Sequence, residues 1–194
     1  MSDNAVSRYP VPALESLPED IRSRILEVQE KSGFVPNIFL VLAHRPDEFR
    51  AFFTYHDALM EKPGGLTKAE REMIVVATSA ANDCPYCVVA HGAILRIRAK
   101  DPLIADRVSI NYREAGLPAR QRAMLDFAVK VAEAPGRLEE TDRDRLKAEG
   151  FSEEDIWDIG AIAGFFALSN RLAAVTSLRP NEEFHLLGRL PRTK

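Results

Sequence analysis

Apolar residues recur at intervals of three and four along almost the whole chain, and no segment shows the strict alternation of a half-buried strand. Breakers such as Lys62-Pro63-Gly64-Gly65 divide this pattern into segments of helical length. The 194 residues, 46% of them apolar, are enough for one domain to bury a core without disulfides or metals. The sequence therefore predicts an all-α, single-domain helical bundle and excludes a disordered, collagen-like or disulfide-framed chain.

Helix-start and helix-stop signals set the expected bounds of the elements. Thr67 precedes Glu70 by three residues, which is the pattern of a capping box at a helix start. The predicted helices span residues 18–31, 38–44, 46–61, 67–81, 85–98, 102–114, 118–132, 140–149 and 152–178. We expect residues 1–178 to form the domain, including an N-terminal helical extension, and residues 179–194 to form a C-terminal extended arm.

The charge balance argues against several classes of partner. With 26 basic and 29 acidic side chains, the net charge is −3, and no basic patch for nucleic acid or anionic lipid stands out. Residues 1–6 lack the basic and apolar regions of a secretory signal. The longest uncharged apolar run, residues 159–168, is about half of what a membrane-spanning helix needs. We expect a cytoplasmic protein with no nucleic-acid or membrane partner.

The two cysteines of the chain form one C-x-x-C motif, Cys84-Pro85-Tyr86-Cys87, and His91 follows it. If Pro85 lies in a first helical turn, both thiols and the imidazole share one helix face. In a reducing compartment this spacing indicates redox chemistry or a metal. A second thiol within reach and a lowered thiol pKa are what a dithiol–disulfide cycle requires.

The two cysteines differ in what would ionise them. The helix dipole acts most strongly on Cys84, which lies nearest the helix N-terminus. His91 lies one turn from Cys87 but two turns, roughly 10 Å, from Cys84. We give proximity to a base more weight than a partial dipole charge, which favours Cys87 as the reactive thiolate.

Glu72 is the acid that we expect to complete this site. It stands directly before the uninterrupted apolar run of residues 73–77. A carboxylate that enters such a helix needs a partner, because an unpaired buried charge is costly. An imidazole is a suitable partner, and the pair would orient the His91 ring as in a nucleophile–base–orienter set. The alternative is an ordinary salt-bridged helix residue.

Other interpretations of these residues are a metal site or a purely structural role. Two thiols and one imidazole supply three zinc ligands, but a structural zinc site needs four and no further cysteine exists, so no metal and no cofactor are expected. The remaining histidines, His44, His56 and His185, are interpreted as structural. In the last predicted helix, Trp157 with Phe165 and Phe166 indicates core or a subunit interface, and Asn170-Arg171 faces the site or caps an interface.

Together, Glu72, the Cys84–Cys87 motif and His91 resemble the alkylhydroperoxidase D-like, or carboxymuconolactone decarboxylase-like, superfamily, and most closely its peroxidase-related branch. Residues 33–37 and 66–91 also resemble that branch, and the likeness spans about residues 34–178. The resemblance implies the helical bundle of that family and a homo-oligomer. It also implies a cysteine-dependent hydroperoxide reductase with peroxiredoxin-like antioxidant activity, whose partners are a small-molecule hydroperoxide and an external thiol reductant.

The resemblance also implies roles for the residues. Cys87 corresponds to the peroxidatic cysteine, Cys84 to the resolving cysteine, His91 to the base and Glu72 to its partner. Tyr86 is a departure, because alkylhydroperoxidase D itself has a histidine between its cysteines; here a tyrosine would donate a hydrogen bond or pack.

Two other functions are compatible with the sequence. The first is a non-peroxidatic oligomer that senses redox state or binds a partner, suggested by Tyr86 and by the very apolar segment 156–178. The second is a carboxymuconolactone decarboxylase-like enzyme, which rests on superfamily analogy alone. The cysteine pair argues against the second, because that chemistry has no evident use for a dithiol.

Overall fold

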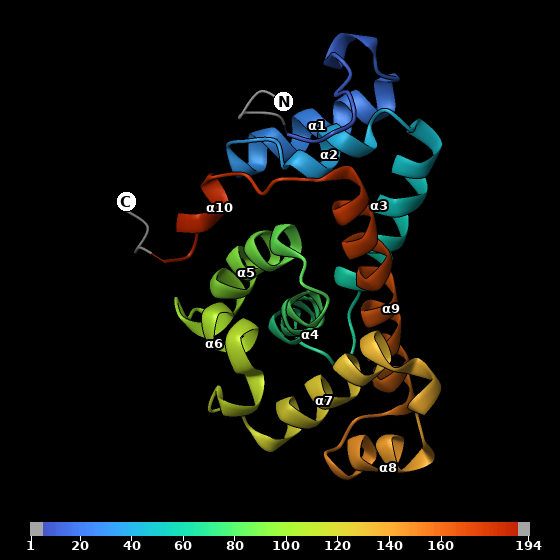
Figure 1. Cartoon of the computed structure of the whole chain (residues 1–194), viewed down its shortest axis with the longest axis vertical. Coiled ribbons are helices and arrows are strands. Elements are labelled where there is room, and N and C mark those ends of the chain that lie inside the picture. The colour runs from blue at the N-terminus through green and yellow to red at the C-terminus, as the bar shows by residue number, and fades with distance from the viewer. Residues whose placement is uncertain (1–5, 190–194) are drawn as a thin grey trace.

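The computed structural model describes residues 6–189, and within this range it contains helices and no β-strand (Figure 1). Its α-helices are α1 (Glu19–Ser32), α2 (Asn37–Leu42), α3 (Pro46–Met60), α4 (Lys68–Ala81), α5 (Pro85–Ala99), α6 (Ile104–Asn111), α7 (Ala119–Glu133), α8 (Glu140–Ala148), α9 (Glu153–Thr176) and α10 (Glu183–Leu186). Short 3-10 turns span Leu14–Ser16, Tyr112–Glu114 and Pro135–Arg137. The prediction of an all-α fold is confirmed.

Helix α4 is the central element, and α5, α6, α7 and α9 surround it (Figure 1). Every residue from Glu70 to Ser79 is buried, as expected of a helix that is covered on all sides. Its start is the predicted capping box: Thr67 accepts a hydrogen bond from the Glu70 N–H, and the Glu70 carboxylate accepts one from the Thr67 N–H. Because α4 is enclosed, its polar side chains must find partners inside the fold.

The N-terminal helices α1, α2 and α3 form a second, smaller core beside the bundle (Figure 1). Three aromatic rings fill it: Phe39 stacks on Phe53 at 4.0 Å, and Phe49 packs against both. Helix α3 also packs along α9, where Phe52 contacts Phe165. This packing holds α3 beside the central helices.

The C-terminal segment differs from the expected extended arm, because its described part contains the short helix α10 and is fastened to α5. The buried guanidinium of Arg96 donates hydrogen bonds to the carbonyls of Phe184 and Leu187, and Arg189 forms a two-point ion pair with Asp106. Residues 190–194 of the arm and residues 1–5 of the N-terminal extension lie outside the described residues. The predicted helix over residues 102–114 is also divided, into α6 and a 3-10 turn.

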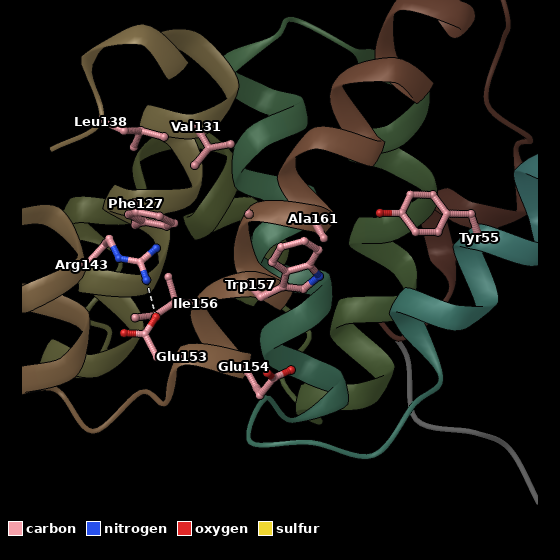
Figure 2. A pocket seen from close by; sticks show the side chains of 11 residues that line it. Tyr55, Phe127, Val131, Leu138, Arg143, Glu153, Glu154, Ile156, Trp157 and Ala161 are labelled. Carbon is pink, nitrogen blue, oxygen red and sulfur yellow. Dashed lines mark hydrogen bonds and ion pairs between the residues drawn. The ribbon is translucent and has the colours of Figure 1, made fainter. Parts of the chain in front are cut away.

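Helix α9 is the one described helix that is long and apolar enough to cross a membrane by length and composition. Half of that apolar window is buried inside the fold. Phe165 and Phe166 belong to the core, whereas Trp157 is 73% exposed. Trp157 borders a surface pocket of about 520 Å³ that Tyr55 and Phe127 also line (Figure 2).

A buried ion pair fastens α4 to α9. Arg71 donates to an Asp158 carboxylate oxygen at 3.0 Å and to the Leu59 carbonyl at 2.7 Å. Lys62 reaches the other Asp158 oxygen at 2.6 Å. The loop that carries Lys62 must pass close to α9, and Gly65 permits this, since a Cβ there would lie 2.3 Å from an Asp155 oxygen.

We expect Arg71→Met to lower the free energy of unfolding by about 3–5 kcal/mol, because it leaves the buried Asp158 carboxylate with only Lys62. Urea denaturation monitored by circular dichroism measures the change. The control is Arg45→Ala, whose partner Glu48 is exposed, with an expected change below about 0.5 kcal/mol. Equal effects of the two substitutions would show that the buried pair does not stabilise the fold.

Candidate active site

The turn between α4 and α5 places the cysteines inside the bundle. Asp83 adopts a left-handed conformation with φ of 50°, and the Cys84 N–H then donates to the Ser79 carbonyl at 2.9 Å. Cys84 is the N-cap of α5 and Pro85 occupies its first turn, as the motif predicted. Both thiols are free and buried, with exposed fractions of 4% for Cys84 and 1% for Cys87.

The structure brings His91 and Glu72 together. His91 follows Cys87 by one turn of α5, and its Nδ1 donates to Glu72 Oε2 at 2.8 Å. Glu72 comes from the enclosed helix α4 and is itself buried. A carboxylate on Nδ1 fixes the ring orientation and leaves Nε2 for proton exchange.

Glu72 has a second partner that the sequence interpretation did not include. Its Oε1 forms an ion pair with Arg98 Nη1 at 3.0 Å, and Arg98 also donates to Glu61 at 2.7 Å. Arg98 stands seven residues after His91, and two turns of α5 bring both side chains to one face. That spacing is the signal that could have identified it.

Helix α9 covers the cysteines with two polar side chains. Ser169 Oγ lies 3.7 Å from the Cys87 sulfur. Asn170 contacts both thiols, donates to Ser79 at 2.9 Å and accepts from Asn82 at 3.0 Å. Asn170 therefore faces the site, which was one of its two expected positions. Ser169 was missed, although a polar pair inside an apolar helix is a usable signal.

The two thiols share one proton unequally. The hydrogen bond that Cys87 donates lowers the pKa of the Cys84 thiol to about 7, and the Asn170 side chain adds to this against the effect of burial. The same hydrogen bond, together with burial, raises the pKa of Cys87 well above its ordinary value. These directions favour Cys84 as the thiol that ionises first, as the dipole argument suggested.

The Tyr86 side chain has a packing role rather than a role in proton exchange at the thiols. Its hydroxyl accepts a hydrogen bond from the Ile38 N–H of α2 at 3.2 Å. Burial raises its pKa far above the ordinary value, so the phenol stays protonated at neutral pH. Tyr86 thus packs α2 against α5.

An apolar cap covers the cysteines on the side of the two chain ends. Phe34 meets Phe184 edge to face at 5.0 Å, and Val41 and Leu178 belong to the same cluster around the thiols.

The pocket beside Trp157 lies elsewhere and includes none of the predicted site residues (Figure 2). Within residues 6–189, no three histidine, cysteine or carboxylate side chains converge as metal ligands would.

Comparison with known proteins identifies the family of this buried dithiol site. The sequence model of the carboxymuconolactone decarboxylase family matches residues 46–102, which include Glu72, both cysteines and His91. A crystal structure of an uncharacterized peroxidase-related protein from Ralstonia eutropha JMP134, with an alkylhydroperoxidase AhpD core, is 67% identical with a TM-score of 0.96, covering 97% of this chain and 100% of that chain.

A second uncharacterized peroxidase-related protein, from Silicibacter sp. TM1040, is 40% identical with a TM-score of 0.92, covering 97% of this chain and 99% of that chain. The chain therefore belongs to the alkylhydroperoxidase D-like family of helical proteins, in its peroxidase-related branch. The debrominase Bmp8, at 19% identity and a TM-score of 0.75 over 97% of this chain and 98% of that chain, shares the fold. The search of curated proteins gave no match.

We expect Cys87→Ala to raise the pKa of the Cys84 thiol from about 7 toward its ordinary value of 9.0, because the S–H donor is lost. The thiolate absorbance in the ultraviolet, followed against pH, measures this pKa. Cys87→Ser is the matched control, since a hydroxyl still donates and the pKa of Cys84 stays low. The same midpoint in both variants would show that the dithiol hydrogen bond does not set the Cys84 pKa.

Proposed function

We propose that this protein is a cysteine-dependent hydroperoxide reductase that cycles between a Cys84/Cys87 dithiol and a disulfide. The observation that carries the proposal is the pair of buried free thiols, one helical turn from an imidazole that bonds to a buried carboxylate. Membership in a branch whose solved members are described as peroxidase-related supports it.

The first half of the cycle consumes the peroxide. The shared proton moves from Cys87 to Cys84, and the Cys87 thiolate attacks the terminal peroxide oxygen. An S–O bond forms, the O–O bond breaks, and Cys87 becomes a sulfenic acid. The alkoxide leaves as an alcohol with a proton from His91, which is protonated when the cycle begins.

The second half closes the disulfide. The Cys84 sulfur attacks the Cys87 sulfenic acid, an S–S bond forms and an S–O bond breaks. The Cys84 proton leaves with the hydroxide as water. An external thiol then reduces the disulfide by exchange, so that one hydroperoxide is converted to alcohol and water as two reductant thiols are oxidised. We further propose that the enzyme acts as a cytoplasmic homo-oligomer.

A redox-sensing oligomer is the second candidate, and the apolar outer face of α9 favours it. Trp157, Leu168 and Val175 are exposed on this helix, whose inner face carries the residues against the thiols. A change of oligomer size with reductant, without peroxide turnover, would support this candidate. Lactone decarboxylation, which the name of the matching family suggests, leaves a buried dithiol without a role.

We expect reduced protein to lose both thiols rapidly when cumene hydroperoxide is added, because each turnover oxidises the pair. Cys84→Ser should accumulate a sulfenic acid on Cys87 that dimedone traps, since no resolving thiol is present. Cys87→Ser should react at the rate of an ordinary free thiol. Full turnover in Cys87→Ser would contradict the proposed role of Cys87, and dimedone labelling in that variant alone would assign the attack to Cys84.

We expect Glu72→Gln to lower turnover at least tenfold, since a neutral amide holds a protonated His91 less strongly and acid–base groups contribute about 10²–10⁴ in rate. Steady-state kinetics with excess thiol reductant measures the effect. Glu70→Gln is the matched control: Glu70 is buried on the same helix but bonds to Thr67 and Arg120. It should change stability and leave turnover per folded enzyme unchanged, and equal losses in both variants would argue against a relay role.

A further inference from the structure

A second acid–imidazole pair lies beside the first, at a histidine that the sequence interpretation treated as structural. His56 comes from α3, and its Nδ1 donates to Asp57 Oδ1 at 3.0 Å. Its ring centroid lies 6.4 Å from that of His91. The two rings are therefore neighbours, and positioned imidazoles exchange protons directly or through one water.

The two pairs are built alike. Arg24 of α1 donates to the other Asp57 oxygen at 2.7 Å, just as Arg98 pairs with the second oxygen of Glu72. The hydrogen bond from His56, and then the one from Arg24, hold the pKa of Asp57 below its ordinary value. Asp57 is therefore a carboxylate at neutral pH, which orients His56 and leaves its Nε2 to exchange protons.

Successive side chains of α9 contact these groups in order. Asn170 contacts Cys84, Ser169 contacts Cys87, and Phe166 meets the His91 ring at 4.7 Å. The Phe166 and Phe165 rings then lie 6.3 and 6.1 Å from the His56 ring. The phenylalanine rings offer a proton no acceptor, whereas the two imidazoles beside them can accept and release one.

The exposed fraction rises from Cys87 through His91 to His56. Cys87 is 1% exposed. The side chains of His91 and His56 are 13% and 26% exposed. A proton released at the buried dithiol therefore reaches progressively more solvated groups in the order thiol, His91, His56. The neighbouring Phe53 ring stacks on the Arg24 guanidinium, which keeps the Asp57 partner in place.

We propose that His56, held by Asp57, is the outer member of a proton relay that connects His91 to solvent. This inference rests on the peroxide reduction proposed above. After His91 gives its proton to the departing alkoxide, a proton enters from solvent at His56 Nε2 and passes through one water to His91. When the dithiol forms again and ionises, its proton leaves by the same path. Each turnover therefore takes up one proton and releases one, and His91 begins the next turnover protonated.

His56→Gln tests the relay, because glutamine preserves polarity and approximate size but cannot carry a proton. We expect kcat to fall roughly tenfold, less than the 10²–10⁴-fold of a group at the reacting atoms, with KM for cumene hydroperoxide unchanged. Free imidazole in the assay should restore a substantial part of the loss. Asp57→Asn keeps the His56 ring but loses its orienting charge, and a smaller fall is expected.

His44→Gln is the matched control, since His44 stacks on Tyr9 and bonds to the Val41 carbonyl, so that its ring has other partners than the acid–imidazole pairs. It should retain wild-type kcat without response to imidazole. Wild-type kcat in His56→Gln would overturn the relay. A loss that imidazole does not restore, accompanied by a lower melting temperature, would also overturn it and make His56 structural. Absence of peroxide turnover in the wild-type protein would instead reject the proposed function, and the relay with it.

Discussion

The arrangement of the site depends on one buried carboxylate. Glu72 lies inside the enclosed helix α4, where an unpaired charge would be strongly destabilising. Its two partners, His91 and Arg98, stand seven residues apart on α5. These two contacts lie on one face of α5 and help to set the rotation of this helix about its axis. The same helix carries Cys87, and its first turn follows Cys84, so both thiols meet Ser169 and Asn170 of α9.

The dithiol chemistry follows from that enclosure. Two thiols in contact, away from water, cannot both ionise, so one proton stays between them. The lowered pKa of Cys84 and the raised pKa of Cys87 are two descriptions of this shared proton. In the proposed cycle, the reaction at Cys87 therefore begins with a proton transfer inside the pair. In that cycle the imidazole gives its proton to the departing alkoxide.

The parts of the site that the sequence predicts are those set by local spacing. Helical periodicity gives the bundle, and the C-x-x-C motif with His91 four residues later gives one face of α5. Local spacing indicates the helix face on which Arg98 and Ser169 lie, but their contacts with Glu72 and Cys87 follow from the packing of α5 and α9 in the bundle, as does the place of His56 on α3. Helix α10 was missed for the same reason: one helical turn is unstable alone, and carbonyl contacts to Arg96 hold it in place.

Tyr86 stands where alkylhydroperoxidase D has a histidine, and in this chain the side chain has a different role. Its phenol contacts the backbone of α2, so this position serves the packing of the N-terminal segment and not proton exchange. The Phe34–Phe184 cap closes the same side of the thiols. The proposed proton path runs instead along His91 and the contact between α3 and α9. A second imidazole from α3 on that route is consistent with a site in which the N-terminal helices contribute to both the cap and the proton path.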